Sequence, residues 1–532
     1  MPIRTRLLIA VVAVTCTIVT IARATPIAGL LAGTILSSGT MNDEIKLHVR
    51  VPSPPVVEGN SEENGDQEDE PRAELHLDRI SSDPYTDPLA QHATEVEPLM
   101  VAHEDTIVTS IQVGRFQGVG SDNIGWATSK DEGRTWKHGF LDGITLVAGG
   151  TWPAVSLPTV AYDHKHRTYL IASMPFDDQG NGRGAVVSRS LDGVNWSEPI
   201  VAASSLGTFA HWIACDNSPA SPFYGNCYDA LFDYSTGVNL NVLVTSNDGG
   251  LTWGSPISAP DQPAGLVTSI AIQPNGNVVV LGRNGGPNGD QEYAIRSVDG
   301  GHTLEATADI ATVFFISPFM RADPNLTSGV DADGTIYVVF PDCRFRSNCY
   351  DSIAASGCRF TTDNSSCTTN DLLLTTSEDG VIWTSPRRIP TDPVNSSVDH
   401  LIAGIGALSD PDDHERRDRD DHERKHRVKL AVTYYYLPNG LTCQPNTCQV
   451  SAGFISSDDG GLSWHEAEKV AGPMMESWLV PTSAGEMVAN VNSAVFVDGK
   501  PHGAFAIARP PDPKTGKFDE AIYATELPEG RD

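Results

Sequence analysis

The chain has 532 residues, of which 40% are hydrophobic and 20% charged, and its formal net charge is -32. This length suits one large all-β domain or two ordinary domains with sizeable cores. The strong negative charge excludes nucleic acids and anionic membrane surfaces as expected partners, because the chain offers no field that would neutralise phosphates.

The first residues of the chain are typical of a secretory signal peptide. Arg4 and Arg6 precede a long apolar run, and the sequence ARA at positions 22–24 has the small residues of a cleavage site. An N-terminal membrane anchor is the alternative, because the apolar run is long. We expect residues 1–24 to be removed and the protein to be secreted and extracellular.

An acidic segment follows the signal sequence. The run EGNSEENGDQEDEPR, at residues 58–72, contains almost no apolar side chains. A segment of this composition cannot bury enough apolar surface to fold by itself. We therefore expect residues 25–90 to be largely disordered and residues 91–530 to form the folded domain.

Six near-copies of one polar turn recur along this domain. They are SKDEGRTW (129–136), SLDGVNW (190–196), SNDGGLTW (246–253), SVDGGHTL (297–304), SEDGVIW (377–383) and SDDGGLSW (457–464). Each lies between two β-rich runs, so it predicts a hairpin turn. Its aspartate is suited to accept backbone hydrogen bonds within the turn. We interpret the six copies as scaffolding, because equal turns on the rim of a ring cannot converge on one substrate.

Pairs of apolar runs separated by Gly or Asp turns fill the intervals between these turns. Counting them gives units that start near Glu95, Pro158, His211, Val267, Arg321, Asp399 and Trp478. Such spacing predicts an all-β fold, a single β-propeller with seven blades, six being the alternative. The last unit lacks the repeated turn, and we expect it to close the ring with a strand from residues 73–81.

Eight cysteines follow the signal sequence in close pairs, which suits local disulfides in a secreted protein. The pairs are Cys215/Cys227, Cys343/Cys349, Cys358/Cys367 and Cys443/Cys448; a crossed pairing within 343–367 remains an alternative. The glycosylation sequons at Asn195, Asn325, Asn364 and Asn395 predict a glycoprotein. The charged stretch 409–427 is interpreted as a solvated insertion, with a metal-binding His/Asp loop as the alternative.

With these repeats in view, the chain resembles the secreted Asp-box (BNR-repeat) proteins of the sialidase-like β-propeller superfamily over residues 90–527. Further stretches that carry the resemblance include IGWATSKDEGRTWKHGFL (124–141) and WIACDNSPASPFYGNCY (212–228). The resemblance implies the propeller fold. True sialidases need an arginine triad, and the early Arg-Ile-Pro motif that supplies one of its members is missing. Arg388-Ile389-Pro390 is in an outer-strand position, so sialidase activity is not supported.

A propeller places its reactive groups at the mouth of the central channel, where inner strands of several blades begin. We single out as candidate catalytic residues Glu97, His211, Asp342, His400 and Tyr435. The candidate substrate-binding residues are Arg115, Trp212, Arg321 and Arg344. Arginines suit an anionic sugar, and paired carboxylates suit acid and base roles in glycoside cleavage. A His/Tyr pair would suit a lyase.

These observations predict a carbohydrate-active propeller that cleaves a glycosidic bond of an anionic extracellular glycan, as a hydrolase or a lyase. The alternative is a non-catalytic propeller that binds a glycan or a protein, since no complete catalytic motif is present. We expect a monomer without cofactor or metal ion, and an extracellular polysaccharide or glycoprotein glycan as its partner.

Overall fold

The structure is a computed structural model that describes residues 75–528, apart from positions 236, 238, 264, 287–288, 355–367, 410–426 and 445–446. Residues 1–71 and 72–532 form separate units, and only the second contains described residues. The predicted signal peptide, the acidic run, the pair Cys358/Cys367, Asn364 and most of the charged insertion therefore lie outside the described residues. No helix in the described part of the chain is long and apolar enough to cross a membrane.

Antiparallel four-stranded sheets follow one another along residues 90–313. Blade 1 contains β2 (Ala90–His103), β3 (Thr106–Phe116), β4 (Ser121–Ser129) and β5 (Lys137–Phe140). Blade 2 contains β6 (Ala154–Asp163), β7 (Thr168–Phe176), β8 (Gly182–Ser190) and the first half of β9 (Ile200–Cys215). Blade 3 contains the second half of β9, β10 (Cys227–Asp233), β11 (Leu240–Ser246) and β12 (Ile257–Ser258). Blade 4 contains β13 (Leu266–Ile272), β14 (Val278–Gly286), β15 (Gly289–Ser297) and β16 (Ala308–Val313).

Three more sheets complete the series. Blade 5 contains β17 (Thr327–Val330), β18 (Ile336–Asp342), β19 (Asp371–Ser377) and β20 (Arg387–Arg388). Blade 6 contains β21 (Asp399–Ser409), β22 (Val428–Leu437), β23 (Gln449–Ser457) and β24 (Glu468–Met475). Blade 7 contains β27 (Ala494–Val497), β28 (Lys500–Arg509), β29 (Asp519–Glu526) and β1 (Asp78–Arg79). A small hairpin of β25 (Val480–Thr482) and β26 (Gly485–Met487) precedes blade 7.

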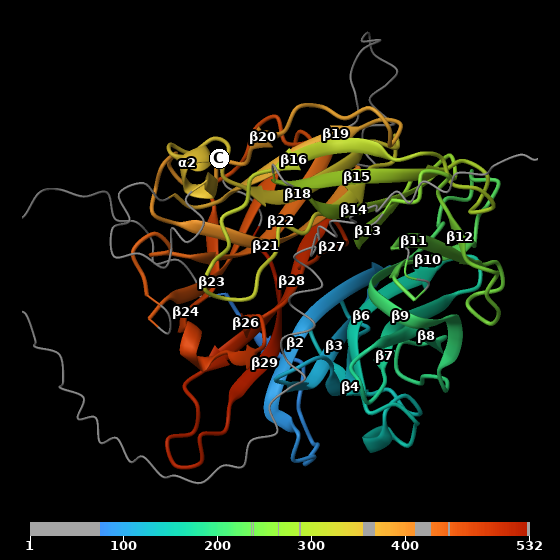
Figure 1. Ribbon diagram of the computed structural model, residues 1–532, viewed down its shortest axis with the longest axis horizontal. Coiled ribbons are helices and arrows are strands. Elements are labelled where there is room, and N and C mark those ends of the chain that lie inside the picture. The colour runs from blue at the N-terminus through green and yellow to red at the C-terminus, as the bar shows by residue number, and fades with distance from the viewer. Residues whose placement is uncertain are drawn as a thin grey trace, which may run out of the picture. The chain divides into compact units, whose positions relative to one another are not determined.

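The sheets form a closed ring with seven members. Each inner strand contacts the inner strand of the next blade in the cyclic order β2, β6, β9, β13, β17, β21, β27 and back to β2. The strands follow one another in colour order around a common centre, with blue β2 beside red β29 (Figure 1). The predicted seven-bladed propeller is confirmed, and β1 from the predicted closing segment 73–81 pairs with β29.

Two predicted boundaries need correction. Residues 75–90 belong to the propeller, because Ile80 is fully buried and donates a backbone hydrogen bond to Ile522 (2.9 Å). The folded domain therefore begins before residue 91. The predicted blade starts at Arg321 and Trp478 are also too early: β17 begins at Thr327 and β27 at Ala494, and polar loop or hairpin residues precede both strands.

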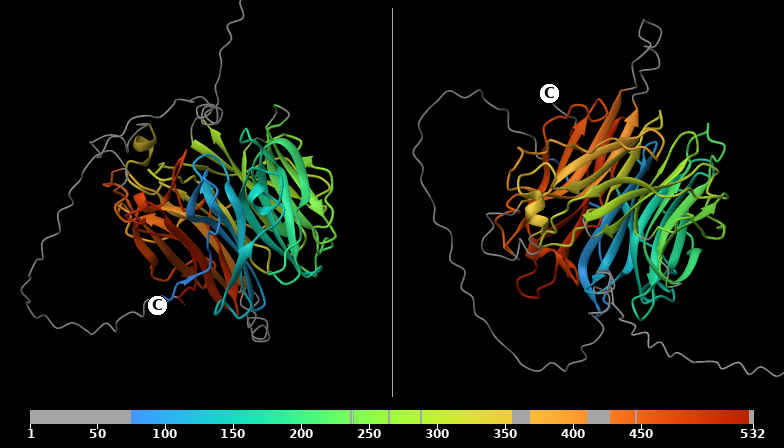
Figure 2. Two further views of the ribbon diagram at one scale, coloured as in Figure 1. Left: turned by 90° about the horizontal axis from the view of Figure 1, so that it is seen from below. Right: turned by 45° about the horizontal axis from the view of Figure 1, so that its top comes forward.

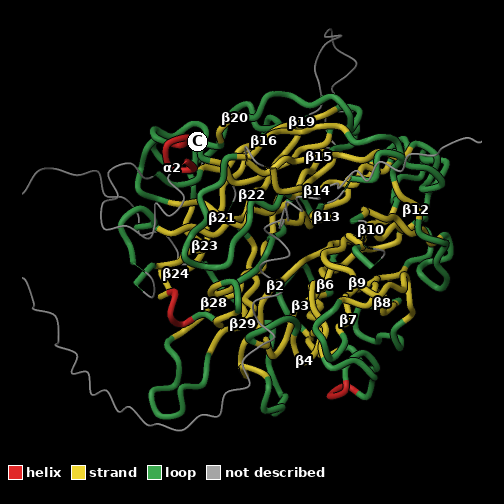
Figure 3. The backbone as a smooth tube through the Cα atoms, in the orientation of Figure 1, coloured by secondary structure: helices red, strands yellow, loops and turns green. Residues whose placement is uncertain are grey.

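Neighbouring sheets pack face to face (Figure 2). Val279 of blade 4 and Val338 of blade 5 share one hydrophobic cluster, and Leu374 of blade 5 and Val432 of blade 6 share another. A sheet that is covered on both faces needs apolar side chains on both faces, which explains continuous apolar strands such as TYLIASMPF in β7. Helix in the described residues is limited to short segments, namely η1 (Leu146–Ala148), α2 (Cys349–Ala354) and η4 (Glu476–Trp478) (Figure 3).

The repeated turns connect the third and fourth strands of blades 1 to 6, as the turn at Ser246 illustrates. Asp248 accepts hydrogen bonds from the Ser246 hydroxyl (2.9 Å), the Thr252 amide (2.9 Å) and the Thr252 hydroxyl (2.6 Å). Gly250 adopts the left-handed φ of 80° that its place in the turn requires. The half-buried Trp253 packs against the cluster between blades 2 and 3. All four observations agree with scaffolding.

These turns also join neighbouring blades. The Thr128 hydroxyl of blade 1 donates to the carbonyl of Gly193 in the turn of blade 2 (2.5 Å). Arg189 of blade 2 donates to the carbonyl of Gly249 in the turn of blade 3, and Arg296 of blade 4 donates to that of Asp379 in blade 5 (2.9 Å). The turn is therefore stabilised within its own blade and is also bonded to the preceding blade.

Three of the predicted disulfides are present: Cys215–Cys227, Cys343–Cys349 and Cys443–Cys448. The second of them removes the crossed alternative for Cys343. Among the predicted glycosylation sites, Asn325 is a poor acceptor in the folded protein, because it is 8% exposed and its side chain bonds Arg283 and the Asn490 carbonyl.

Candidate functional site

A pocket of about 650 Å³, counted out to its open mouth, lies at the centre of the ring, at the end where the inner strands begin. Blades 1 to 5 and the loop before blade 7 contribute to it. The polar and aromatic lining residues are Glu97, Thr159, Phe209, His211, Trp212, Thr268, Arg321, Asp323, Asn325 and Asn490.

Interruptions of the inner strands shape this pocket. The inner strands of blades 1, 2, 3 and 6 contain β-bulges, where the pairing register shifts. Near each bulge a residue other than glycine adopts a left-handed conformation: Glu97 (φ 56°), Leu157 (φ 53°), Ala210 (φ 62°) and Ile402 (φ 52°). Such conformations cost about 1–3 kcal/mol each and cluster at functional sites. Three of the four residues line the pocket, so the bulges direct their chain segments toward the axis.

Glu97 is the acidic group of the pocket floor. It is 5% exposed, and its carboxylate accepts hydrogen bonds from the side-chain amides of Gln112 (3.0 Å) and Asn490. Burial raises the pKa of Glu97, and the positive charges of Arg321 and Arg115 offset only part of this effect. The arrangement produces a carboxyl group that holds its proton to a higher pH than an ordinary glutamate.

His211 lies beside Glu97 and is buried with both ring nitrogens engaged. Its Nδ1 is 3.1 Å from Oδ1 of Asp229, a buried residue of β10, and its Nε2 is 2.8 Å from the Leu157 carbonyl oxygen. Burial by itself lowers the pKa of His211, but the charge and hydrogen bond of Asp229 outweigh it and raise the pKa. Because both partners accept hydrogen bonds, we assign His211 as a doubly protonated imidazolium.

Arg321 supplies a second positive charge. Its backbone amide donates to the Glu486 carbonyl (2.8 Å), so hairpin β25–β26 positions it. Its half-buried side chain lines the pocket and makes no hydrogen bond or ion pair with any residue that the structure describes. Arg321 therefore has hydrogen-bonding capacity left for a ligand, and a guanidinium group recognises carboxylates and sulfates well.

A second polar network forms the wall of the pocket near blades 4 and 5. Arg283 Nη2 lies 3.1 Å from Oδ1 of Asp323, and Arg283 Nε donates to Asn325 (2.8 Å). Asn325 donates to the carbonyl of Asn490 (3.1 Å), whose side chain reaches Glu97. This chain of contacts links the half-exposed Asp323 to the buried Glu97 across the pocket.

The structure brings together four of the nine predicted site residues. Glu97 from blade 1, His211 and Trp212 from blade 3 and Arg321 from the loop before blade 5 all line the pocket. The remaining five residues do not line it, and each has partners of its own.

Arg115 lies close to the pocket but stabilises its own hairpin. It is 2% exposed, and its guanidinium donates to the backbone carbonyls of Phe116 (2.7 Å), Gly118 (3.0 Å) and Gly120. Burial and repulsion from Arg321 lower the pKa of Arg115 to about 9. Its charge still acts on Glu97, but the expected direct role in substrate binding is corrected, because Arg115 does not line the pocket and both of its terminal nitrogens donate to the hairpin.

Asp342 and Arg344 pair with each other. Asp342 Oδ2 is 2.8 Å from Arg344 Nη2 and also accepts from the Phe314 amide (2.9 Å). Arg344 further donates to the carbonyl of Thr312. The pair fixes the loop after β18, so neither residue has the catalytic or substrate-gripping role that the sequence predicted in the pocket.

His400 and Tyr435 lie in the packing of blade 6. His400 is 2% exposed, stacks on Tyr436 (6.2 Å between centroids) and places Nδ1 at 3.2 Å from the Asn370 carbonyl. Tyr435 is fully buried, and its hydroxyl both donates to the Ala506 carbonyl (3.2 Å) and accepts from the Ala506 amide (2.7 Å). A tyrosine bonded on both sides to the neighbouring blade cannot reach a ligand, which corrects the predicted catalytic role.

One described cluster has metal-ligand chemistry: Asp371, Asp392 and His400 lie near one another. Arg346 is 2.6 Å from Asp371 and 3.2 Å from Asp392, and Arg388 is 2.9 Å from Asp371. Two guanidinium groups thus balance the two carboxylates, and a cation would have to compete with both. Arg388, part of the Arg-Ile-Pro stretch, lies in outer strand β20 as predicted.

Sequence reasoning missed Gln112, Asp229, Asn325 and Asn490. A signal was present for Asp229, because it is a charged residue inside the apolar part of strand CYDALFD, between Tyr228 and Ala230. The two asparagines lie in loops that no local pattern connects to blade 1. Only the closed ring places Asn490 beside Glu97.

The sequence matches no protein-family model and no curated protein. Among solved structures, the chain is similar to a Hadza microbial sialidase (TM-score 0.39, 13% identity, 82% of this chain and 66% of that chain). It is also similar to phage phi92 endosialidase (TM-score 0.44, 11% identity, 86% and 70%) and to an ulvan lyase of polysaccharide lyase family PL25 (TM-score 0.44, 13% identity, 85% and 96%). The chain spans just under two thirds of the length of the Hadza sialidase. Likenesses this low carry no information about the reaction, which has to be inferred from the site.

Proposed function

We propose that this chain is a secreted carbohydrate-active propeller that cleaves a glycosidic bond of an extracellular glycan in the central pocket. The observation that carries the proposal is the convergence of Glu97, His211 and Arg321, from three parts of the ring, on one concave site. Amide, carboxyl and guanidinium groups suit a hydroxyl-rich ligand, and Trp212 offers an aromatic face for a sugar ring.

Glu97 is the proposed general acid. A carboxyl group whose pKa is raised by burial keeps its proton to a higher pH than an ordinary glutamate and can protonate a leaving oxygen. Asp323, half-exposed and paired with Arg283, is the proposed second carboxyl group, which activates water. Arg321 binds a carboxylate or sulfate of the sugar, because its guanidinium has no partner among the described residues.

Asp229 is a positioning residue in this scheme. It holds the imidazolium of His211 between its own carboxylate and the Leu157 carbonyl, and so fixes the bulged segment opposite Glu97. A lyase reaction would require a free base at this position. Because both nitrogens of His211 are engaged, hydrolysis fits this geometry better than elimination.

Product analysis tests the proposal. The secreted protein is incubated with a panel of polysaccharides that contains uronic, sulfated, sialylated and neutral members, and the products are analysed by mass spectrometry. Products that contain one added water per cleavage support hydrolysis, whereas unsaturated products indicate a lyase. Release of free sialic acid would contradict the argument against sialidase activity.

The second candidate function is a non-catalytic glycan- or protein-binding propeller. Both carboxylate oxygens of Glu97 accept hydrogen bonds from side-chain amides. Such a rigidly held glutamate would also suit a residue that only binds a ligand. In this case the panel yields no product, while binding of one of its members is lost when Arg321 is replaced.

A further inference from the structure

The loop after β18 presents two aromatic side chains to solvent. Phe345 is 43% exposed and Tyr350, in α2, is 62% exposed. Large apolar side chains that are exposed singly are common, but here two aromatic side chains are exposed on one short loop, five residues apart. The central pocket uses neither of them.

This loop is firmly anchored. The disulfide Cys343–Cys349 closes it, and Arg344 is bonded to Asp342 at its first turn. Arg346 is 4% exposed and reaches Asp371 (2.6 Å), Asp392 and the hydroxyl of Thr369 (2.8 Å) underneath the loop. With the loop fixed in this way, the exposed rings have little conformational freedom left to lose on binding a ligand.

The rings have ordered neighbours. Tyr350 lies edge-on against Phe314, with 4.8 Å between ring centroids, and the Arg344 guanidinium lies 5.6 Å from the centroid of Phe314. Phe314 thus supports Tyr350 from below, and the free area of the tyrosine ring faces outward. We call Phe345 and Tyr350, with Phe314 packed against Tyr350, the aromatic platform.

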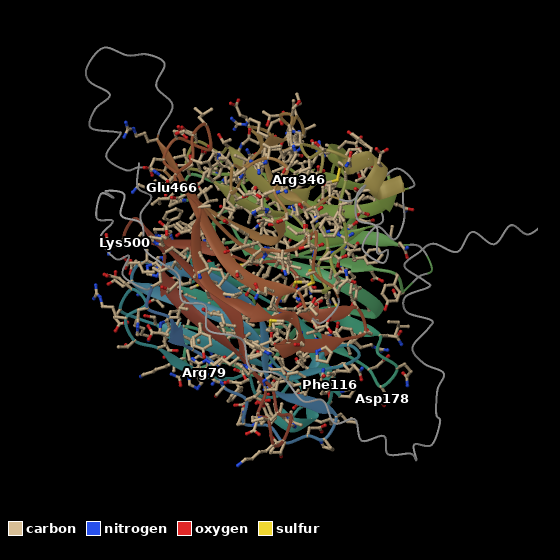
Figure 4. The ribbon with its side chains drawn as sticks, turned by 90° about the vertical axis from the view of Figure 1, so that its left-hand side faces the viewer. Arg79, Phe116, Asp178, Arg346, Glu466 and Lys500 are labelled. Atoms are coloured by element: carbon tan, nitrogen blue, oxygen red, sulfur yellow. A yellow bond between two sulfur atoms is a disulfide. The ribbon has the colours of Figure 1, made fainter. Side chains whose placement is uncertain are left out.

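The platform and the pocket lie at the same end of the propeller. Strand β18 runs antiparallel to β17, so its last residue Asp342 is at the same end of blade 5 as Asp323 and Asn325, which precede β17 and line the pocket. Figure 4 views the ring from its edge. Arg346 of this loop and Phe116 lie toward the right-hand face of the ring, and Lys500 lies toward the left-hand face. In Figure 1, α2 lies toward the outside of the ring.

The arginines of the loop are compensated within the protein. Arg344 is balanced by Asp342, and Arg346 by Asp371 and Asp392. Asp351, next to Tyr350 in α2, adds one exposed negative charge beside the platform. The exposed aromatic faces themselves suit the apolar face of a sugar ring.

We propose that Phe345 and Tyr350 form an outer sugar-binding subsite, which stacks on a unit of a polysaccharide chain whose other end occupies the central pocket. This inference rests on the proposed function, because it takes the pocket ligand to be a glycan. It predicts a preference for long chains over short oligosaccharides, and a contribution to binding that does not depend on salt.

Affinity electrophoresis tests the subsite. The full-length protein and its variants migrate through native gels that contain polygalacturonate, ulvan, polysialic acid or neutral xyloglucan. We expect at least one polymer to retard the wild type, and the double variant Phe345→Ala/Tyr350→Ala to bind that polymer about ten-fold more weakly, since each stacked ring is worth roughly 0.5–1.5 kcal/mol. Tyr350→Phe keeps the ring and should retain the binding. Leu462→Ala removes an even more exposed apolar side chain (77%) from a repeated turn and should have no effect.

The outcomes separate the subsite from the proposed function. Retention that falls in the double variant and is unchanged between low and high salt supports the platform. Retention that is unchanged in the double variant overturns it, and so does a wild type that no polymer retards. In both of these cases, cleavage of short oligosaccharides by the wild type still decides the proposed function separately. Equal melting temperatures of wild type and double variant exclude a general loss of structure.

Discussion

The two ends of the propeller differ in how their polar residues are arranged, although the same strands connect them. At the end of the repeated turns, Asp248 and its counterparts receive hydrogen bonds from their own turn, and the pattern repeats in six blades. At the pocket end, Glu97 and Leu157 hold strained conformations, and buried charges lie close together. Turns whose polar groups are all hydrogen-bonded stabilise the fold. Strained backbone and buried charges cost free energy of folding, and natural proteins keep such features mainly at functional sites. Substitutions at the two ends should therefore affect different measurements.

The largest effect is expected for Glu97→Gln. Gln keeps the shape and one acceptor but cannot donate the proton, so kcat on the polysaccharide identified by product analysis should fall about 10²–10⁴-fold, the usual worth of general acid catalysis. The melting temperature should change little. Glu104→Gln, at a side chain that is 83% exposed, is the matched control. Full activity of Glu97→Gln would show that Glu97 is not the general acid.

A pH-dependent effect on stability is expected at the seam between blades 1 and 7. Glu95 accepts a hydrogen bond from Ser81 (2.7 Å), and burial raises the pKa of Glu95 to about 7, with Glu520 buried nearby. Because the folded-state pKa is above the ordinary glutamate value of 4.5, the protonated group stabilises the fold fully below about pH 4.5, and this stability is lost as the pH rises through about 7.

The measurement is urea unfolding of wild type and Glu95→Gln at several pH values. Between about pH 5 and pH 8 the unfolding free energy of the wild type should fall by up to roughly 3 kcal/mol relative to the variant. Glu526→Gln, at a half-exposed glutamate paired with Lys500, serves as control. Parallel pH curves for wild type and Glu95→Gln would contradict the prediction.

A smaller effect is expected for Arg321→Ala. Loss of one charge-assisted contact of about 1.5–3 kcal/mol should weaken binding of an anionic glycan roughly ten- to hundred-fold. Binding of a neutral glycan should change little, and Arg321→Lys should restore part of the affinity but not the paired hydrogen bonds. Equal losses for anionic and neutral glycans would mean that Arg321 does not recognise the charge.

The smallest effect is expected for Asp248→Ala at the opposite end. Removal of the acceptor of three hydrogen bonds in a half-exposed turn should cost about 1–2 kcal/mol of stability. It should lower the apparent melting temperature, while glycan binding and cleavage remain unchanged. A loss of activity at unchanged stability would show that the two ends are not separate in function.

Much of the fold could be predicted from the sequence because its signals are local. Ser246, Asp248 and Thr252 lie within seven residues of one another, and so do Cys343 and Cys349. Their contacts form whatever the rest of the chain does, and their regular recurrence predicts the number of blades. Among the candidate site residues, Glu97, His211, Trp212 and Arg321 could be found because each lies at or just before an inner strand.

The other predicted residues show where local reasoning fails. Arg344 follows Asp342 by two residues, and the two side chains form a local ion pair. The guanidinium of Arg344 is therefore already paired and is not left for a ligand. Tyr435 is the second of three successive tyrosines. Only the packing of blade 6 against blade 7 decides that its side chain lies on the buried face of strand β22. Strand alternation alone cannot predict this choice, because a single β-bulge reverses which residues face the core.

The sequence by itself determined the repeated turns, the short-range disulfides and the count of blades, because these depend on contacts between residues close in the chain. The tertiary structure alone decided the site. Asn490 meets Glu97 only because the ring closes, and Asp229 meets the Leu157 carbonyl through His211 only because adjacent blades pack with bulged inner strands. Convergence of distant residues depends on the register and closure of the whole ring, and no stretch of sequence contains that information.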